Sequence, residues 1–204
     1  SPKDYKNDEN TSISSALLET SIENQIQRNK VGYLNLSKNK LSNLEDFIEF
    51  KMQLASDSLF KHLTTLKLEK NSIKSIPESA FQNMEQLKIL DLSENRLTKV
   101  PWFVFKYSPL ENLNLSKNNI KQFCLSKTDK TTLKIGVNIS EKSLHFLRQL
   151  KKISLKGNSI ADINEKFLEN CDKIDSVNLS ENKLVKPIRE EDDKVKVKLN
   201  IGYE

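Results

Sequence analysis

The chain has 204 residues, of which 36% are hydrophobic and 30% charged, and its formal net charge is +5. This length suits one domain or one elongated array, and the mixed charge favours solubility with only a weak preference for anionic partners. No apolar run approaches the roughly 18 residues of a membrane-spanning helix, and two cysteines are too few for a disulfide framework.

The first thirty residues precede any repeated pattern. Residues 1–10 are polar and are expected to form a disordered tail; they carry neither an initiator Met nor a signal-peptide apolar core. Residues 11–30 predict an amphipathic helix, because Ile13, Leu17 and Ile22 recur at helical spacing. We expect this helix to cover the open end of the core that follows.

From residue 31 onward one spacing recurs. Leu87 is followed by Leu90, Leu92 and Leu97 at offsets of three, five and ten, with Asn95 at offset eight. The same pattern occupies residues 31–41, 63–73, 87–97, 110–120, 150–160 and 174–184. Two weaker copies are expected, one near residue 132, where Ser140 replaces the asparagine, and one from about residue 196. Recurrence in phase predicts a repeated structural unit.

Each unit should contain a short strand and a return segment. Side chains alternate along a strand, so Leu90 and Leu92 face one side while Ile89 and Asp91 face the other. One unit cannot bury its apolar side alone, but stacked units form a continuous core and a parallel sheet. A buried turn needs a donor and an acceptor, and asparagine supplies both. The predicted structural ladder comprises Asn39, Asn71, Asn95, Asn118, Asn158 and Asn182.

The pattern LxxLxLxxNxL resembles that of the leucine-rich-repeat family over residues 31–201. The resemblance implies an α/β solenoid, a curved right-handed superhelix with a parallel sheet on its concave side. It assigns residues 31–188 to the repeats and places segments such as 76–87 and 100–110 on the convex side. Such solenoids mostly mediate protein–protein contacts, so the resemblance also implies an interaction module or scaffold.

Several segments depart from the regular repeat. The long first interval contains residues 43–63, which predict a helix on the convex side. Residues 189–204 predict a charged loop followed by a capping edge strand rich in lysine. Cys171 aligns with the apolar Met84 and should lie in the core, whereas Cys124 has a different phase and is not expected to pair with it. On the convex side, the aromatic residues either pack against neighbouring return segments or form an interface; they are Trp102, Phe103 and Tyr107.

The outward side chains of the strands are not needed by the core and form the predicted partner-binding surface. It comprises Tyr33, Lys67, Ile89, Asp91, Asn112, Asn114, Lys134, Lys151, Lys152, Ser154, Lys156 and Asn178. Four lysines of the later strands have no acid between them in these rows, so an acidic partner protein is expected there. The alternative is RNA or another polyanion, although no aromatic stacking platform accompanies the lysines.

Other classes of function find little support in the residues. His62 and His145 have no neighbouring Cys, Asp or Glu at metal-ligand or triad spacing, and no glycine-rich phosphate loop occurs. We therefore expect no catalytic residue, metal or cofactor. The chain could also be the recognition segment of a larger receptor or enzyme. Two unpaired thiols slightly favour a cytoplasmic location over a secreted one. The Asn-x-Ser sequons, such as those at Asn35 and Asn114, arise mainly as a by-product of the repeat.

Overall fold

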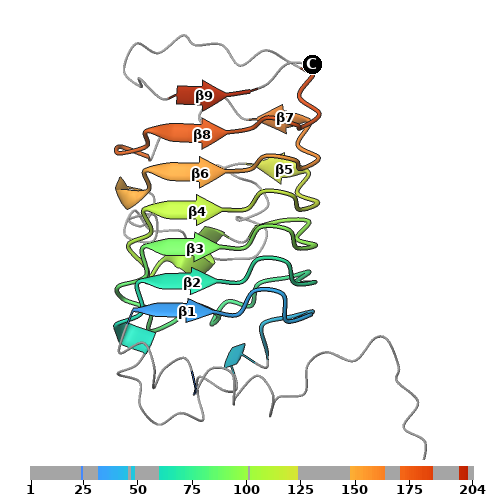
Figure 1. Cartoon of the computed structure of the whole chain (residues 1–204). Coiled ribbons are helices and arrows are strands. Elements are labelled where there is room, and N and C mark those ends of the chain that lie inside the picture. The colour runs from blue at the N-terminus through green and yellow to red at the C-terminus, as the bar shows by residue number, and fades with distance from the viewer. Residues whose placement is uncertain are drawn as a thin grey trace, which may run out of the picture.

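The computed structural model describes residues 24, 32–45, 47–48, 60–100, 102–123, 148–163, 171–185 and 198–201. Within them, a 7-stranded parallel sheet runs in the order β1, β2, β3, β4, β6, β8 and β9 (Figure 1). The strands are β1 (Tyr33–Asn35), β2 (Thr65–Lys67), β3 (Ile89–Asp91), β4 (Asn112–Asn114), β6 (Lys152–Ser154), β8 (Ser176–Asn178) and β9 (Lys198–Asn200). The predicted parallel sheet and its repeat spacing are confirmed.

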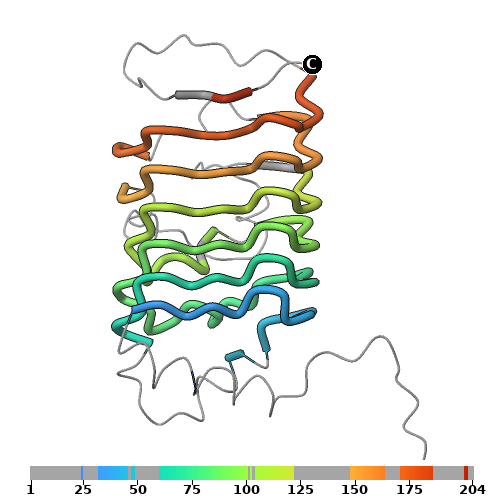
Figure 2. The backbone as a smooth tube through the Cα atoms, in the orientation of Figure 1, coloured from blue at the N-terminus to red at the C-terminus, as the bar shows by residue number. Residues whose placement is uncertain are grey.

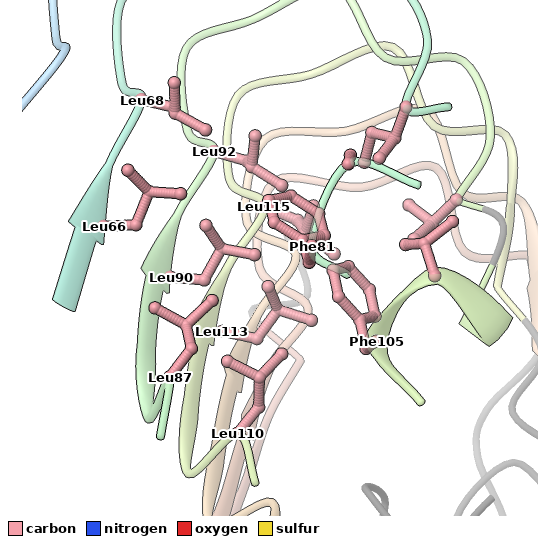
Figure 3. Packing of buried hydrophobic residues seen from close by; sticks show 14 of the residues in the cluster. Leu66, Leu68, Phe81, Leu87, Leu90, Leu92, Phe105, Leu110, Leu113 and Leu115 are labelled. Carbon is pink, nitrogen blue, oxygen red and sulfur yellow. The ribbon is translucent and has the colours of Figure 1, made fainter. Parts of the chain in front are cut away.

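The core lies behind the sheet, where the central residue of each strand from β1 to β8 in this sheet has an aliphatic side chain that points inward. Leu66, Leu90 and Leu113 occupy equivalent positions in adjacent strands, and all three are buried. Figure 3 shows these leucines pointing toward Phe81 and Phe105, which come from the return segments. The two aromatic rings stack with centroids 5.5 Å apart. The stacking of successive repeats therefore buries apolar surface that no single repeat could remove from water.

The return segments hold the predicted apolar residues against this core. Ile76 is buried, and a short 3-10 helix, η1 (Trp102–Phe105), follows the third repeat. Trp102 is half-buried, and its ring lies 6.2 Å from that of Phe105. This ring contact lies within η1 itself, and Trp102 also packs against the common core. Tyr107 is 45% exposed. The side chain of Phe103 lies outside the description.

The predicted helix at residues 43–63 is seen in part. Glu45, Phe47 and Ile48 are helical near its start, and Phe60 is helical near its end. The rings of Phe47 and Phe60 meet edge to face with centroids 5.8 Å apart. Both rings are buried, so this longer return segment joins the common core.

Buried asparagine amides connect successive repeats. Asn118 Oδ1 accepts the Leu97 backbone N–H at 2.9 Å, and its Nδ2 donates to the carbonyl of Leu92 at 3.0 Å, both in the preceding repeat. The same Nδ2 also donates to Leu115 in its own repeat, again at 3.0 Å. Equivalent bonds to the preceding repeat are made by Asn71, Asn95, Asn158 and Asn182. Asn39, in the first repeat, donates its backbone N–H to Asn71 Oδ1.

The residue before each ladder asparagine adopts a left-handed turn conformation. Its φ is 63° at Lys38, 54° at Glu94 and 66° at Gly157. In the five repeats from Lys38 to Gly157, the backbone N–H of this residue donates to a carbonyl of the next repeat, for example from Glu94 to Ser116 at 2.9 Å. Figure 2 shows the resulting turns stacked along one side of the molecule. On the return path, β5 (Gln122–Phe123) pairs in parallel with β7 (Asp162–Ile163).

The prediction that a weak repeat near residue 132 adds a strand to the sheet is wrong. β4 pairs directly with β6, with Leu113 opposite Ile153, so no strand lies between them. The asparagine ladder also passes directly from the fourth repeat to the repeat of β6, because the backbone N–H of Ile120 donates to Asn158 Oδ1. Ser140 stands where the weak copy needs an asparagine, and its hydroxyl cannot make the three bonds of that amide. Residues 124–147 themselves lie outside the description.

Three other expectations for the ends fall largely outside the described residues. They are the disordered tail at 1–10, the helical cap at 11–30, of which only Asn24 is described, and the charged loop that begins at residue 189. The last strand is seen: β9 pairs in parallel with β8 and is the last strand in the sheet order.

The ladder predicts a large difference between two adjacent asparagines. Asn118→Ala should lower the free energy of unfolding by on the order of 3 kcal/mol, because it strands a buried N–H and buried carbonyls. Asn119→Ala is the matched control: that side chain is exposed, and its loss should change stability by less than about 0.5 kcal/mol. Urea denaturation of the two variants measures the difference, and equal values would refute a stabilising ladder.

Candidate functional site

Two rows of side chains project from the outer face of the sheet. The first row contains Tyr33, Thr65, Ile89, Asn112, Lys152 and Ser176, in register across adjacent strands. The second row contains Asn35, Lys67, Asp91, Asn114, Ser154 and Asn178. We call these rows together the sheet face. They bring the predicted binding residues of distant sequence segments onto one surface.

Two apolar side chains of the first row are open to solvent. Tyr33 is 46% exposed and Ile89 is 36% exposed. They lie two strands apart, with Thr65 between them in register. Neighbouring strands are about 4.8 Å apart, so the two side chains are separated by about 10 Å. This end of the sheet face therefore offers apolar surface that the core leaves unused.

The second row is held by bonds to serines two residues further along the chain. Asn114 Oδ1 accepts the Ser116 backbone N–H at 3.1 Å and its hydroxyl at 2.6 Å. The same paired bonds occur at Asn35, Asp91 and Asn178. The acceptor oxygens of this row therefore shape the exit from each strand. The sequon serines at these asparagines share that role.

Asp91 is the buried charged member of the second row. Its carboxylate accepts bonds from Ser93, from Lys67 Nζ at 3.1 Å and from Asn114 Nδ2 at 3.2 Å. Burial alone would raise the pKa of Asp91, but the Ser93 and Lys67 bonds outweigh it and lower the pKa below its ordinary value. Lys67 and Asp91 consequently form an internal pair on the sheet face.

The predicted run of lysines without acids between them is wrong. Lys151 Nζ lies 2.7 Å from Glu111 Oε2, and Lys156 Nζ lies 3.0 Å from Glu181 Oε1. Lys88 also approaches Glu111, at 3.4 Å. The hydrogen bond from Lys151 lowers the pKa of Glu111 and raises that of Lys151. These two lysines are thus largely neutralised by neighbouring repeats.

Lys152 differs from its neighbours. It is exposed in the first row and makes no ion pair within the part of the chain that the structure describes. Lys134, the fourth lysine of the predicted patch, lies outside that part. Of the predicted basic surface, the described residues therefore leave Lys152 as the cation available to a partner.

The residues considered for chemistry occupy separate places. Cys171 is buried in the core, where burial, with a smaller effect of Asp172, raises the pKa of its thiol to about 12. His62 is exposed. Over the described ranges, the structure contains no group of three or more His, Cys, Asp or Glu side chains able to hold a metal ion. None of the helices in these ranges has the length and apolar character needed to span a membrane.

The family is shown by two sequence models. The model described as "Leucine rich repeat" matches residues 61–120, and that described as "BspA type Leucine rich repeat region (6 copies)" matches residues 118–191. Together with the parallel stack of strands, these matches show that the chain belongs to the leucine-rich-repeat family. Their residues include every strand from β2 to β8.

Individual relatives resemble the chain over most of its length. Osteomodulin of Bos taurus is 28% identical over 78% of this chain and 32% of that protein. Tsukushi of Mus musculus is 31% identical over 65% of this chain and 36% of that protein. The chain thus spans about a third of the length of these relatives. A solved leucine-rich repeat domain of APL1B is 19% identical, with a TM-score of 0.54 over 81% of this chain and 42% of that one.

The Asp91 network predicts a specific pH dependence. Because the folded pKa is lowered, the carboxylate adds stability above its ordinary pKa of 3.8, and this contribution is lost as pH falls through the folded pKa. Asp91→Asn should cost about 1 kcal/mol at neutral pH, through the lost Lys67 pair. It should also make stability less sensitive to acid than in the wild type.

Urea unfolding at neutral and acid pH measures this effect. Asparagine already occupies the equivalent position at Asn35, Asn114 and Asn178, so the variant retains an acceptor for Ser93. Asp172→Asn, at an exposed surface position, controls for the removal of a carboxylate. Identical acid sensitivity in the wild type and Asp91→Asn would contradict the assignment.

Proposed function

We propose that this chain is a non-enzymatic module that binds a partner protein on the sheet face, the face expected to be concave. The observation that carries the proposal is the exposure of Tyr33 and Ile89 in one register row. Aromatic side chains are enriched in protein interfaces, and a partner would remove their apolar surface from water. Membership of the leucine-rich-repeat family supports a binding role.

Neither exposed side chain is explained by folding. Leu34 and Leu90, which follow Tyr33 and Ile89 in their strands, point inward and are buried. The asparagine ladder lies beyond the end of each strand and makes its bonds to backbone groups. Tyr33 and Ile89 therefore lie on the side of the sheet opposite to the core, where replacing them leaves both structural devices intact.

The rest of the first row supports a contact surface that changes from apolar at β1 to β3 to polar and basic at β4 and β6. Asn112 is half-buried and lies in register beyond Ile89, and exposed Lys152 follows it on the next strand. In the proposed complex, apolar residues of the partner contact the β1–β3 end. Polar and acidic residues contact Asn112 and Lys152. The second row contributes less specific contact, because its acceptors already bind serines.

The proposal predicts that a double substitution of the apolar row weakens binding. Tyr33→Ser/Ile89→Ser should reduce affinity for a captured partner by about tenfold or more, because tyrosine is among the residues enriched at the few interface positions that contribute about 2 kcal/mol or more. The partner is first isolated from native lysate with the wild-type chain. Its affinity for purified variants is then titrated, with a thermal melt to verify folding.

A matched control comes from elsewhere on the surface. Tyr107 is 45% exposed on the convex side, and Val185 is 77% exposed beyond the last ladder asparagine. Tyr107→Ser/Val185→Ser removes comparable apolar surface away from the sheet face and should leave affinity unchanged. If this control weakens binding while the sheet-face variant does not, the partner binds elsewhere.

A further inference from the structure

The turns that follow the first four strands carry a dense group of cations. The backbone N–H of Lys38 donates to Glu69, that of Lys70 to Ser93 and that of Arg96 to Ile73, so turn positions of successive repeats lie side by side. The basic residues at these positions are all exposed; they are Lys38, Lys40, Lys70, Lys74, Arg96, Lys117 and Lys121. We call them the basic edge.

The basic edge is only weakly neutralised. The turns after β1 to β4 carry two acids, Glu69 and Glu94. Glu94 lies 3.9 Å from Lys70 and 3.7 Å from Lys117, whereas Glu69 makes no ion pair with any described residue. The other five cations make no ion pair with any described residue. Four strands span about 15 Å, so these like charges repel one another at short range. The corresponding turns after β6 and β8 hold fewer charges: the cations Lys156 and Lys183 and the acid Glu181, which pairs with Lys156.

The backbone does not explain these lysines. Lys38, Lys40, Lys70 and Lys117 all have positive φ, between 53° and 63°. Glycine and asparagine adopt this conformation more readily than lysine does. Glycine stands at the position equivalent to Lys38, Lys70 and Lys117 in a later repeat, where Gly157 has a φ of 66°. Lysine at four such positions adds charge at a backbone cost, which indicates a role outside folding.

We propose that the basic edge binds an acidic segment of a protein partner. The turn positions contain no aromatic side chain, so they lack the stacking platform that single-stranded nucleic acids use. Six of the seven cations are lysines, which act as adaptable point charges, whereas arginine is the preferred residue for planar phosphate recognition. Carboxylates spread along a polypeptide satisfy such a surface without fixed geometry.

The position of the basic edge also favours a protein. Lys38 follows Tyr33 by five residues, so their Cα atoms are at most about 18 Å apart. A partner held at Tyr33 and Ile89 can therefore extend over these turns. In this respect the inference rests on the proposed function, and it adds an acidic segment of the partner at the turns to the polar and acidic residues proposed to contact Asn112 and Lys152.

The test uses the whole chain and three defined probes. Labelled poly-L-glutamate, heparin and polyuridylate are titrated by fluorescence anisotropy at low ionic strength and at about 0.15 M, where surface charge contacts are screened. Poly-L-glutamate should bind, with an affinity that falls as salt rises. Binding of heparin or polyuridylate without poly-L-glutamate would overturn the proposal, as would the absence of binding to all three.

Charge reversals locate the site. Lys74→Glu/Lys121→Glu should weaken poly-L-glutamate binding by about tenfold or more, the effect of roughly 1.4 kcal/mol. Lys61→Glu/Lys173→Glu makes the same change in net charge at exposed positions away from the basic edge and should have little effect. Equal weakening in both pairs would show attraction to net charge alone and would overturn the proposal.

The same variants separate this inference from the proposed function. Tyr33→Ser/Ile89→Ser should retain poly-L-glutamate binding, because it leaves every cation in place. If a captured partner loses affinity for Tyr33→Ser/Ile89→Ser but binds Lys74→Glu/Lys121→Glu normally, the proposed function holds and the basic-edge inference is overturned. A partner that depends on Lys74 and Lys121 supports the inference.

Discussion

The buried amide between successive repeats is the interaction on which the remaining structure depends. Each strand of the sheet has three residues, so its own ladder of backbone bonds is short. Leucine burial is non-directional and tolerates sliding. Asn95 and Asn118 instead bond to defined backbone groups of their own and the preceding repeat. One register satisfies all of them, and this register aligns both the sheet face and the turns.

The sequence predicts those parts of the fold in which a local structural requirement, such as burial or hydrogen bonding in a turn, is met by one residue type. The inward leucines, the short strands and the positions of the asparagines follow from spacing, because period-two alternation and a buried turn demand them. The weak repeat near residue 132 was predicted because Ile135 and Val137 occupy the two inward strand positions of the pattern, and it failed because Ser140 stands where the asparagine is needed. Apolar alternation is common to many buried segments, whereas the bond from Ile120 to Asn158 identifies the true next repeat.

The error in the array explains one of the two ion pairs that the sequence did not predict, that between Lys151 and Glu111. A strand inserted between β4 and β6 would separate Glu111 from Lys151 by two spacings, about 10 Å. Without that strand the two residues are neighbours and their charged atoms lie 2.7 Å apart. Glu181 was missed for a different reason, because it lies at a turn position while Lys156 follows the end of a strand. An ion pair between repeats depends on which two strands are adjacent and on which position each residue occupies along its strand or turn. Comparing residues within one row of equivalent positions does not detect such pairs.

The same geometry separates the surface into parts that folding uses and parts that it leaves open. Serine bonds occupy the second row, the amide ladder occupies the inside of each turn, and leucines fill the core. Of the sheet face and the turns, these contacts leave the first row and the outside of the turns available for other roles. Two features lie toward the same end of the array: the exposed apolar side chains of the first row belong to β1 and β3, and the basic edge follows β1 to β4. Two independent features that gather on the same repeats argue for one partner contacting that end of the solenoid.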